Sequence, residues 1–298
     1  MRRKAALAIR GLALAMNRDA PCMVRVEGIS QPFLLPLSHQ LPAYRARHRL
    51  YDRMLRDLAD YIRGEGGLRM VDVGANVGDS ILSTAPVPSD TFLAFEPHPS
   101  FIPYLQANTA QIAGVTLSDA ACGPGEGSVQ IRTAARGTAG TTVGEAMERV
   151  ASLTSLDSAL ERLWPGVAPN FVKIDTDGFD VDVLVGGRRL WREMHPWLLY
   201  EMDPSLTRGH INRHLDGLAF LREAGYESAA AFTNTGQFDT RVDLADRESW
   251  EALMGGHSKV GPVHYHDVLL APSENDLTSF LELLTQRRDP GAVTPASA

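Results

Sequence analysis

The stretch that most constrains the fold is an apolar run that ends in an acid and then turns on two glycines. It reads Met-Val-Asp-Val-Gly-Ala-Asn-Val-Gly-Asp-Ser over residues 70–80. The β-branched run that begins at Leu68 predicts a strand, and residues 81–82 resume the apolar pattern at helical spacing. Because glycine has no Cβ and tolerates positive φ, Gly74 and Gly78 predict a tight strand-to-helix turn whose backbone can approach a ligand.

Asp72, just before the turn, indicates which ligand the turn can take. The spacing is D-x-G-x-x-x-G rather than the G-x-G-x-x-G of dinucleotide binders. A pyrophosphate prefers an unobstructed helix N-terminus, and a carboxylate before the turn would repel it. The same carboxylate suits a cationic or amino-bearing ligand. S-adenosylmethionine carries both a sulfonium and an ammonium group.

A second acid follows at the spacing expected for a nucleoside site. Residues 91–96 form a short apolar run that ends in Glu96 and is stopped by Pro97. Glu96 lies about 20 residues after the glycine turn, where an acid at the tip of the second strand binds ribose hydroxyls. Either acid alone would more often be an exposed residue at a strand end. Asp72 and Glu96 together, at this spacing, favour a nucleoside site.

The composition limits the class of protein. The chain has 298 residues, of which 44% are hydrophobic and 22% charged, which is ample apolar material for a full core. Its net charge of −7 argues against a general nucleic-acid binder, which needs a basic surface. Cys22 and Cys122 show no metal-ligand spacing and fit a reducing compartment, so we expect a cytoplasmic protein.

The N-terminus looks only superficially like a signal peptide. Arg10 interrupts the apolar stretch of residues 1–16, and no clear small-residue cleavage site follows. The stretch is too short to span a bilayer. We predict a basic amphipathic helix that packs on the domain or makes weak contact with an anionic membrane surface. No other run reaches transmembrane length.

The remaining pattern predicts an α/β fold behind an N-terminal extension. Residues 22–27 and 32–37 predict a small hairpin or an irregular cap, and residues 48–63 predict a helix with apolar side chains every four positions. Strands and helices then alternate, which predicts a mostly parallel, Rossmann-like sheet with helices on both faces. We expect strands near residues 68–73, 91–96, 115–118, 170–175, 197–202 and 263–270, an edge strand at 128–132, and helices near 78–84, 100–110, 178–191 and 211–224.

These elements suggest three parts of the chain. We expect an extension over residues 1–64 that packs on the core, a main α/β domain over 65–287, and a disordered tail over 288–298. Residues 133–144 are rich in Thr, Ala and Gly, and they predict either a mobile loop over a site or a surface excursion.

Acids gather after the fourth predicted strand. The run FVKIDTDGFD, residues 171–180, brings Asp175 to the carboxyl end of the strand, while Asp177 and Asp180 open the next helix. Ligands bind at that edge of an open α/β sheet. A carboxylate there can accept the proton of a hydroxyl aligned with a sulfonium methyl group, so Asp175 and Asp177 are candidate bases. Asp177 and Asp180 could instead stabilise the helix start.

Glu201 and several histidines are further candidates. Glu201 ends the next strand at the same edge, where it could bind substrate hydroxyls or be a solvated strand end. His98 follows Glu96 and Pro97 and lies near the expected ribose site. His264 and His266 share a face of the last strand, but no third ligand is identifiable, so a surface or core role is favoured over a metal pair.

A series of motifs extends over residues 70–204. They read VDVGANVGDS, AFEPHPSFIPYLQAN, SLTSLDSAL, FVKIDTDGFDVDVLVGG and LLYEMDP, in that order. Together they resemble the FkbM family of S-adenosylmethionine-dependent methyltransferases. The resemblance implies a class I methyltransferase sheet, S-adenosylmethionine as cofactor, and transfer of a methyl group to oxygen. Acceptors in that family are commonly sugars of glycans or hydroxyls of natural products.

The resemblance also assigns residues by position. The matching residues are Asp72, Gly74, Asn76 and Gly78 in the cofactor turn, Glu96 as the ribose acid, and Asp119 after the third strand as an adenine contact. Two positions depart from the family. His98 stands where the family often has Asn, and Asp177 and Asp180 stand where it usually has Glu in K-I-D-x-E-G-x-E. Both positions keep a carboxylate, and each side chain is one methylene shorter than in the family.

We therefore predict an O-methyltransferase that acts on a hydroxyl of a sugar or natural product, with Asp175, Asp177 and Glu201 as catalytic candidates and no required metal. A nicotinamide-dependent oxidoreductase is disfavoured by Asp72 and by the missing G-x-G-x-x-G. A non-catalytic binding module is disfavoured by the retained acids. A magnesium-assisted enzyme, with Asp175 and Asp177 as ligands, is a further alternative.

Overall fold

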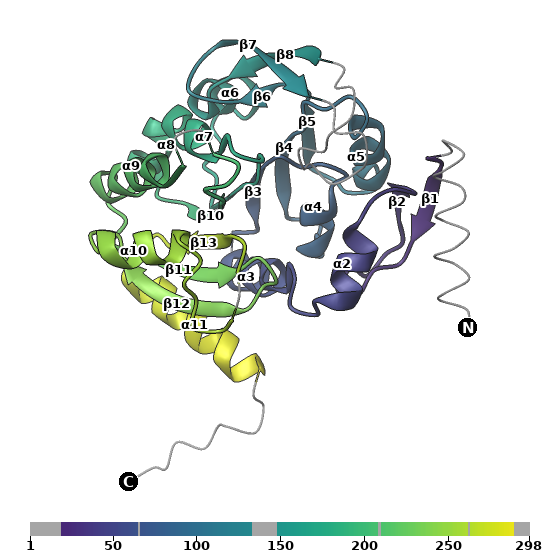
Figure 1. Cartoon of the computed structure of the whole chain (residues 1–298). Helices are drawn as coiled ribbons and strands as arrows, with labels where there is room; N and C mark the ends of the chain where they lie inside the picture. The colour runs from purple at the N-terminus through teal and green to yellow at the C-terminus, as the bar shows by residue number, and fades with distance from the viewer. Residues whose placement is uncertain (1–18, 65, 133–147, 208–209, 262, 289–298) are drawn as a thin grey trace.

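The computed structural model describes residues 19–64, 66–132, 148–207, 210–261 and 263–288 (Figure 1). The expected first helix, the loop at 133–144 and the tail from residue 289 onward lie outside these ranges. Within them, no helix is both long and apolar enough to cross a membrane.

An eight-stranded sheet forms the centre of the molecule, in the order β12-β11-β13-β10-β9-β3-β4-β5. Its strands are β3 (Arg69–Val73), β4 (Thr91–Phe95), β5 (Val115–Ser118), β9 (Phe171–Ile174), β10 (Trp197–Met202), β11 (Ser228–Thr233), β12 (Phe238–Asp243) and β13 (His266–Leu270). Strands β3, β4, β5, β9 and β10 pair in parallel, and β13 is antiparallel to both of its neighbours. The predicted class I methyltransferase sheet is confirmed.

The strand order changes direction between β3 and β9. The chain runs outward through β4 and β5, and later returns to place β9 and β10 on the other side of β3. At such a switch point the loops from the two halves of the sheet diverge and leave room for a ligand at the carboxyl ends of the strands. The glycine turn after β3 and the acids after β9 therefore lie at the same edge.

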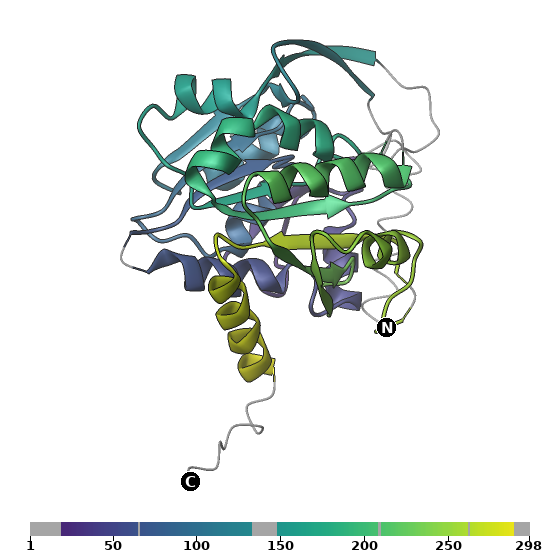
Figure 2. The same ribbon diagram turned by 90° about the vertical axis from the view of Figure 1, so that its left-hand side faces the viewer.

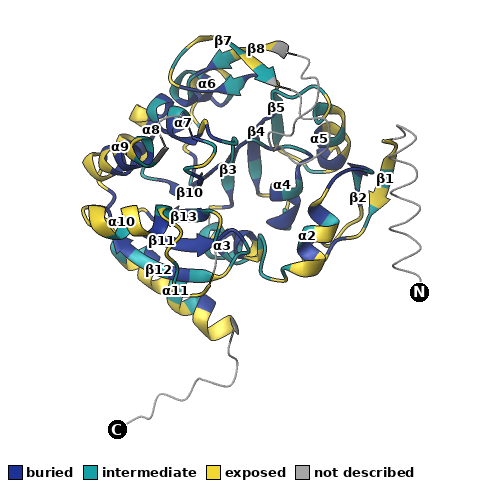
Figure 3. Cartoon of the chain, viewed as in Figure 1, coloured by how far each residue is buried: buried dark blue, intermediate teal, exposed yellow. Residues whose placement is uncertain are grey.

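Helices cover both faces of the sheet (Figure 2). They are α2 (Leu41–Arg47), α3 (Arg53–Arg63), α4 (Asp79–Ser83), α5 (Ile102–Thr109), α6 (Leu156–Leu163), α7 (Asp180–Gly186), α8 (Arg188–Met194), α9 (His210–Glu223), α10 (Arg247–Met254) and α11 (Glu274–Arg288). Because side chains alternate along a strand, Val71 and Val73 join the core under α6–α10, whereas Met70 joins the core under α3 and α11. Figure 3 shows buried residues through the sheet and exposed ones on the outer surfaces of α9, α10 and α11.

The N-terminal extension packs directly on the glycine-turn region. Strands β1 (Pro21–Val24) and β2 (Phe33–Pro36) form the expected antiparallel hairpin. Phe33 and Leu35 share an apolar cluster with Val77, within the turn, and with Leu82, in the helix that follows it. The helix predicted from residue 48 begins only at Arg53, because Asp52 has φ +54° and a left-handed residue cannot continue a helix.

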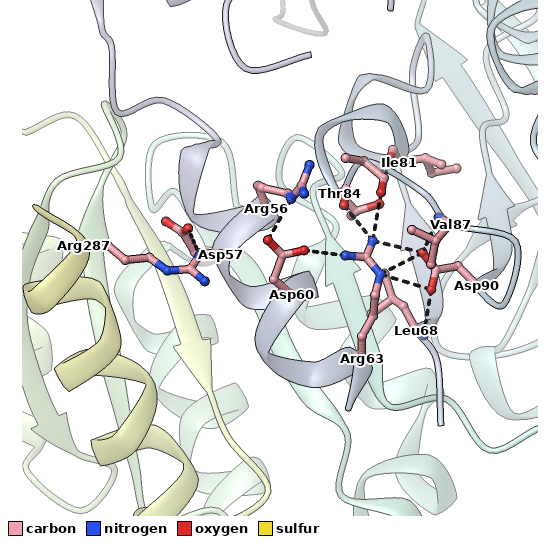
Figure 4. Close-up of polar contacts among 11 residues, drawn as sticks. Arg56, Asp57, Asp60, Arg63, Leu68, Ile81, Thr84, Val87, Asp90 and Arg287 are labelled. Atoms are coloured by element: carbon pink, nitrogen blue, oxygen red, sulfur yellow. Dashed lines mark hydrogen bonds and ion pairs between the residues drawn. The ribbon is translucent and has the colours of Figure 1, made fainter. Parts of the chain in front are cut away.

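Arg63 at the end of α3 fastens the extension to the sheet (Figure 4). Its guanidinium donates to the buried carboxylate of Asp90 at 3.0 Å, to Asp60 at 2.6 Å and to the carbonyl of Thr84 at 2.7 Å. Asp90 also accepts the backbone N–H of Leu68 at 3.0 Å, directly before β3. This network joins the end of α3 to the loop that leads into β4.

The strand expected at 128–132 is β7 (Gly127–Arg132), and it is an edge strand as predicted. It belongs to a separate three-stranded sheet with β6 (Ala121–Cys122) and β8 (Glu148–Thr154). The single helix expected over 178–191 is two short helices, α7 and α8, that meet at Gly187. The sequence pattern also gave no signal for the hairpin of β11 and β12.

Candidate active site

The turn between β3 and α4 has left-handed backbone at Gly74 (φ +85°), Asn76 (φ +49°) and Gly78 (φ +85°). Gly74 lies against the end of β9: a Cβ at this position would be 1.8 Å from the carbonyl oxygen of Asp175. The prediction of a glycine turn is confirmed, but the physical reason for Gly74 differs from the one expected. Glycine is needed there because two strand ends of the protein meet, independently of any ligand.

Glu96 is held in place by the backbone of the turn. Its Oε2 accepts the N–H of Asn76 at 2.8 Å, and its Oε1 accepts the N–H of His98 at 2.7 Å. Burial raises the pKa of Glu96 to about 7, and these two hydrogen bonds oppose that rise. Each carboxylate oxygen has a further lone pair, so the group can still accept hydrogen bonds from ribose hydroxyls.

Asp119 lies beside Glu96, at the end of the neighbouring strand. The backbone N–H of Glu96 donates to the carbonyl of Ser118 at 3.0 Å, and Asp119 follows as an exposed residue. The structure thus brings the sequence-predicted cofactor residues together at the carboxyl edge of β3, β4 and β5. They are Asp72, Gly74, Asn76, Gly78, Glu96 and Asp119.

Asp72 is fully buried on β3, and neither of its carboxylate oxygens has a hydrogen-bond partner. Burial raises its pKa to about 7, against the opposing effect of Lys173, its neighbour across the strands. A buried carboxylate without partners is costly, and a cationic group beside it would remove that cost. The residues of this edge therefore fit S-adenosylmethionine, which carries two positive groups near a ribose.

Lys173 and Asp175 form an ion pair at the end of β9. Nζ of Lys173 lies 2.7 Å from Oδ2 of Asp175, with the lysine buried and the aspartate side chain 42% exposed. Burial acts to lower the pKa of Lys173, but Asp175 and Asp72 outweigh it and raise that pKa above its ordinary value. The ammonium is therefore a fixed positive charge between two acids.

Asp177 and Asp180 have different roles in the structure. Asp180 is buried, and its two oxygens accept the N–H groups of Thr176 and Gly178, each at 3.1 Å. It holds the loop after β9, in agreement with the structural alternative. Asp177 precedes α7 with φ +52° and does not cap it. Burial, followed by Asp175 and Asp180, raises the pKa of Asp177 to about 7.

Glu201 lies near the end of β10, directly opposite Asp267 of β13. Glu201 is 7% exposed, and its Oε2 has no hydrogen-bond partner. Burial, and then Asp175, raises the pKa of both acids well above the ordinary range. With Lys173 and Asp175 they line a cavity of ≈ 30 Å³. The alternative that Glu201 is a solvated strand end is wrong, because the side chain is buried.

Further residues of this cavity had no place in the sequence-based site. Tyr51 and Asp52 come from the extension, and Tyr265 precedes β13. The signal for Asp267 was available in principle: a final strand that runs antiparallel starts at the edge where its neighbours end, so its first residues reach the site. No local pattern marked Tyr51 or Asp52, because they reach the site only through the packing of α3.

The histidines contribute little to this edge. His98 supplies its backbone N–H to Glu96, and its ring stacks near Phe101 at 5.0 Å between centroids. His266 is buried 3.1 Å from Asp239, whereas His264 lies exposed before β13 begins. In the described part of the chain, no group of three or more His, Cys, Asp or Glu side chains could hold a metal ion.

A sequence model of the FkbM methyltransferase domain matches residues 72–228, more than half of the chain. The chain belongs to the FkbM methyltransferase family. S-adenosylmethionine is accordingly its cofactor, and the family resemblance predicted from the motifs is confirmed. A comparison with curated proteins finds none that matches this FkbM methyltransferase.

Solved structures of methyltransferases resemble this chain at low sequence identity. An FkbM methyltransferase from Methylobacillus flagellatus KT is 14% identical, with a TM-score of 0.41 over 78% of this chain and 58% of that one. A second structure is that of the O-methyltransferase TomG from Streptomyces achromogenes, involved in tomaymycin synthesis, in complex with S-adenosylmethionine. It is 12% identical, with a TM-score of 0.42, and the match covers 84% of this chain and 91% of that one. An S-adenosylmethionine-dependent methyltransferase from Agrobacterium tumefaciens is 9% identical, with a TM-score of 0.45; the match covers 85% of this chain and 70% of that one.

Proposed function

We propose that this FkbM methyltransferase transfers the methyl group of S-adenosylmethionine to a hydroxyl oxygen of a sugar, in a glycan, polysaccharide or glycolipid precursor, or of a natural product. The observation that carries the proposal is the position of Asp177. It follows β9 at the edge that the cofactor residues share, and its pKa of about 7 suits a group that takes up a proton near neutral pH.

The cofactor would be held by residues on the β3, β4 and β5 side of the edge. Asp72 would face the positive end of the ligand, Glu96 would accept the ribose hydroxyls, and Asp119 would lie near the adenine. The backbone of the turn at Asn76 and Gly78 would lie against the bound ligand. When bound, S-adenosylmethionine supplies an electrophilic methyl group at its sulfonium.

The acceptor would approach from the β9 and β10 side. A hydroxyl is a weak nucleophile, so a carboxylate that accepts its proton as the methyl group arrives lowers the barrier. We assign this role to Asp177, because one oxygen of Asp175 is already bound to Lys173 at 2.7 Å. Asp175 and Glu201 would orient the acceptor. Alignment of nucleophile and methyl group then supplies the remaining acceleration.

An exposed aromatic side chain supports a sugar as the acceptor. Phe179 is 43% exposed and comes two residues after Asp177, at the start of α7. Ligand sites combine apolar and aromatic surfaces with a few polar groups, and a sugar ring presents both kinds of surface. The exposed Phe179 beside the partly buried Asp177 matches that combination.

The setting of the enzyme remains part of the proposal. We place it in the cytoplasm because its cysteine usage is typical of reducing compartments. We propose an extension over residues 1–64, a methyltransferase domain over 65–287 and a tail over 288–298. Weak contact of the first helix with a membrane surface stays a prediction, since residues 1–18 lie outside the described ranges.

Calorimetric titration with S-adenosylhomocysteine, with NAD as the control, tests the cofactor half of the proposal. Saturable binding of S-adenosylhomocysteine alone supports it, and binding of NAD alone contradicts it. A screen of sugar acceptors with S-adenosylmethionine labelled in the methyl group tests the other half. The NMR shift of the transferred carbon distinguishes a methyl ether from an N-methyl group. Activity that survives a chelator would dispose of the magnesium-assisted alternative.

A further inference from the structure

Glu201 and Asp267 place two carboxyl groups side by side, the first buried and the second half-buried. They are directly opposite each other in the antiparallel pair of β10 and β13, where Cβ atoms lie about 5 Å apart and like charges destabilise the sheet. Oε2 of Glu201 has no hydrogen-bond partner although the residue is 93% buried, being 7% exposed. Both side chains line the same small cavity.

The cations near this cavity are engaged elsewhere. Lys173 lies 2.7 Å from Asp175, and Arg45 lies 3.1 Å from Asp52. Neither Glu201 nor Asp267 has an ion-pair partner in the described part of the chain. The cavity is therefore lined by two acids with counter-ions and two without.

We propose that this cavity binds the ammonium group of the acceptor, so that the acceptor is an amino sugar with a free amine. The inference rests on the proposed function and specifies its substrate class. The cavity volume of ≈ 30 Å³ has room for one or two groups the size of water or ammonium, and none for a sugar ring. The ring would therefore lie outside the cavity, toward Asp177 and Phe179.

An ammonium group fits the cavity better than a hydroxyl does. It has three N–H donors and a positive charge, so it can bind Glu201 and Asp267 together and donate once more to Tyr51 or Tyr265, whose side chains also line the cavity. A hydroxyl donates one hydrogen bond, so the second carboxyl group would be left without a donor. Charge-assisted hydrogen bonds are also roughly twice as strong as neutral ones.

Binding should release a proton. Before the ligand arrives, burial and the neighbouring acids favour a proton on the Glu201 and Asp267 pair. An ammonium ion that enters between the two groups takes the place of that proton, which passes to the buffer. Lys173 stays bound to Asp175 and is not displaced.

The test is calorimetric titration of the protein, saturated with S-adenosylhomocysteine, with glucosamine and with glucose in two buffers of different ionisation enthalpy. We expect glucosamine to bind at least tenfold more tightly than glucose, with net proton release. Glu201→Gln should abolish the preference, whereas Glu223→Gln, an exposed acid on α9, should keep it. Glu201→Gln replaces the carboxyl group by a neutral amide of similar size that can donate to Asp267, so its melting temperature should not fall.

Equal affinities for glucose and glucosamine would overturn the inference, and so would weak or undetectable binding of both. A preference that survives Glu201→Gln would overturn it as well. The first titration, with S-adenosylhomocysteine, keeps the two proposals apart. If S-adenosylhomocysteine binds and the amine preference is missing, only the ammonium site is wrong; if S-adenosylhomocysteine does not bind, the proposed function fails.

Discussion

Gly74 and Asp175 meet at the point where the two halves of the sheet divide, so closely that a Cβ on Gly74 would lie 1.8 Å from the carbonyl oxygen of Asp175. The glycine turn after β3 and the acid-bearing loop after β9 thus share one contact. We expect a change in either strand end to shift both sides of the candidate site.

Gly74→Ala should therefore destabilise the protein by more than its backbone angle explains. The matched control is Gly166→Ala, since Gly166 has a similar φ of +77° but no atom within 4 Å of a built Cβ. Left-handed strain costs about 1–2 kcal/mol, and overpacking adds about 1–3 kcal/mol. Denaturant unfolding should show a larger loss for Gly74→Ala. Equal losses for the two variants would refute the contact.

Arg63→Ala should loosen the extension from the sheet. The change leaves the buried carboxylate of Asp90 without its cation, and such a loss costs about 3–5 kcal/mol. Arg56→Ala on the same helix removes only an exposed pair with Asp60 and should cost about 0.5 kcal/mol. Thermal melts of the two variants measure the difference. Similar melting temperatures would show that the network in Figure 4 contributes little.

Glu96→Ala should weaken binding of S-adenosylhomocysteine about 10- to 100-fold, because hydrogen bonds to a charged group are worth about 1.5–3 kcal/mol. The N–H groups of Asn76 and His98 also lose their acceptor. Calorimetry gives the affinity directly. An unchanged affinity would show that the ribose does not bind at Glu96.

Asp177→Asn should lower kcat by about 10²–10⁴-fold and leave the affinity for S-adenosylhomocysteine unchanged. Since a base acts in its deprotonated form, the rate of the unmodified enzyme should rise with pH through about 7 and then level off. The variant should lose that inflection. Asp182→Asn, in the first turn of α7, is the control and should behave like the unmodified enzyme. A pH profile that is the same in Asp177→Asn would remove Asp177 as the base.

Asp72→Asn should change how the stability of the cofactor-free protein depends on pH. The pKa of Asp72 is raised in the folded state, from 3.8 to about 7, so the folded protein binds a proton more tightly than the unfolded chain. This group's contribution is fully present below about pH 4 and is lost as the pH rises through about 7. Melting temperatures at pH 5 and pH 8 should therefore differ less in Asp72→Asn. If the difference between the two melting temperatures is the same in the variant, Asp72 either is exposed or has a partner.

Six of the eight strands of the central sheet could be predicted, and β11 and β12 could not. Residues 115–118 and 197–202 were predicted as strands with the bounds that the structure has, because short runs with apolar residues, placed between turns and helices, are typical of an alternating α/β pattern. The acids at the strand ends followed from the same pattern. An acid that ends a buried apolar run in a parallel sheet must emerge at the carboxyl edge, which places Asp72, Glu96, Asp175 and Glu201 together.

The environment of those acids could not be predicted. The sequence left Asp180 open as either a structural acid at the helix start or a functional one. Only its hydrogen bonds with the N–H groups of Thr176 and Gly178 showed that it holds a loop. Asp267 and Tyr51 come from opposite ends of the chain. Their distance from Glu201 depends on long-range packing, which no local pattern encodes.

The sequence alone determined the family and the cofactor, through the resemblance of its motifs, and it predicted the edge of the sheet where the candidate site lies. That edge follows from the period of apolar residues and from the spacing of glycines and acids, which act over a few residues at a time. The tertiary structure decided which carboxyl groups have partners and which are buried without them. Burial and electrostatic partners are properties of the packed interior, where segments distant in the chain, such as Asp52 and Asp267, displace water from the same few ångströms.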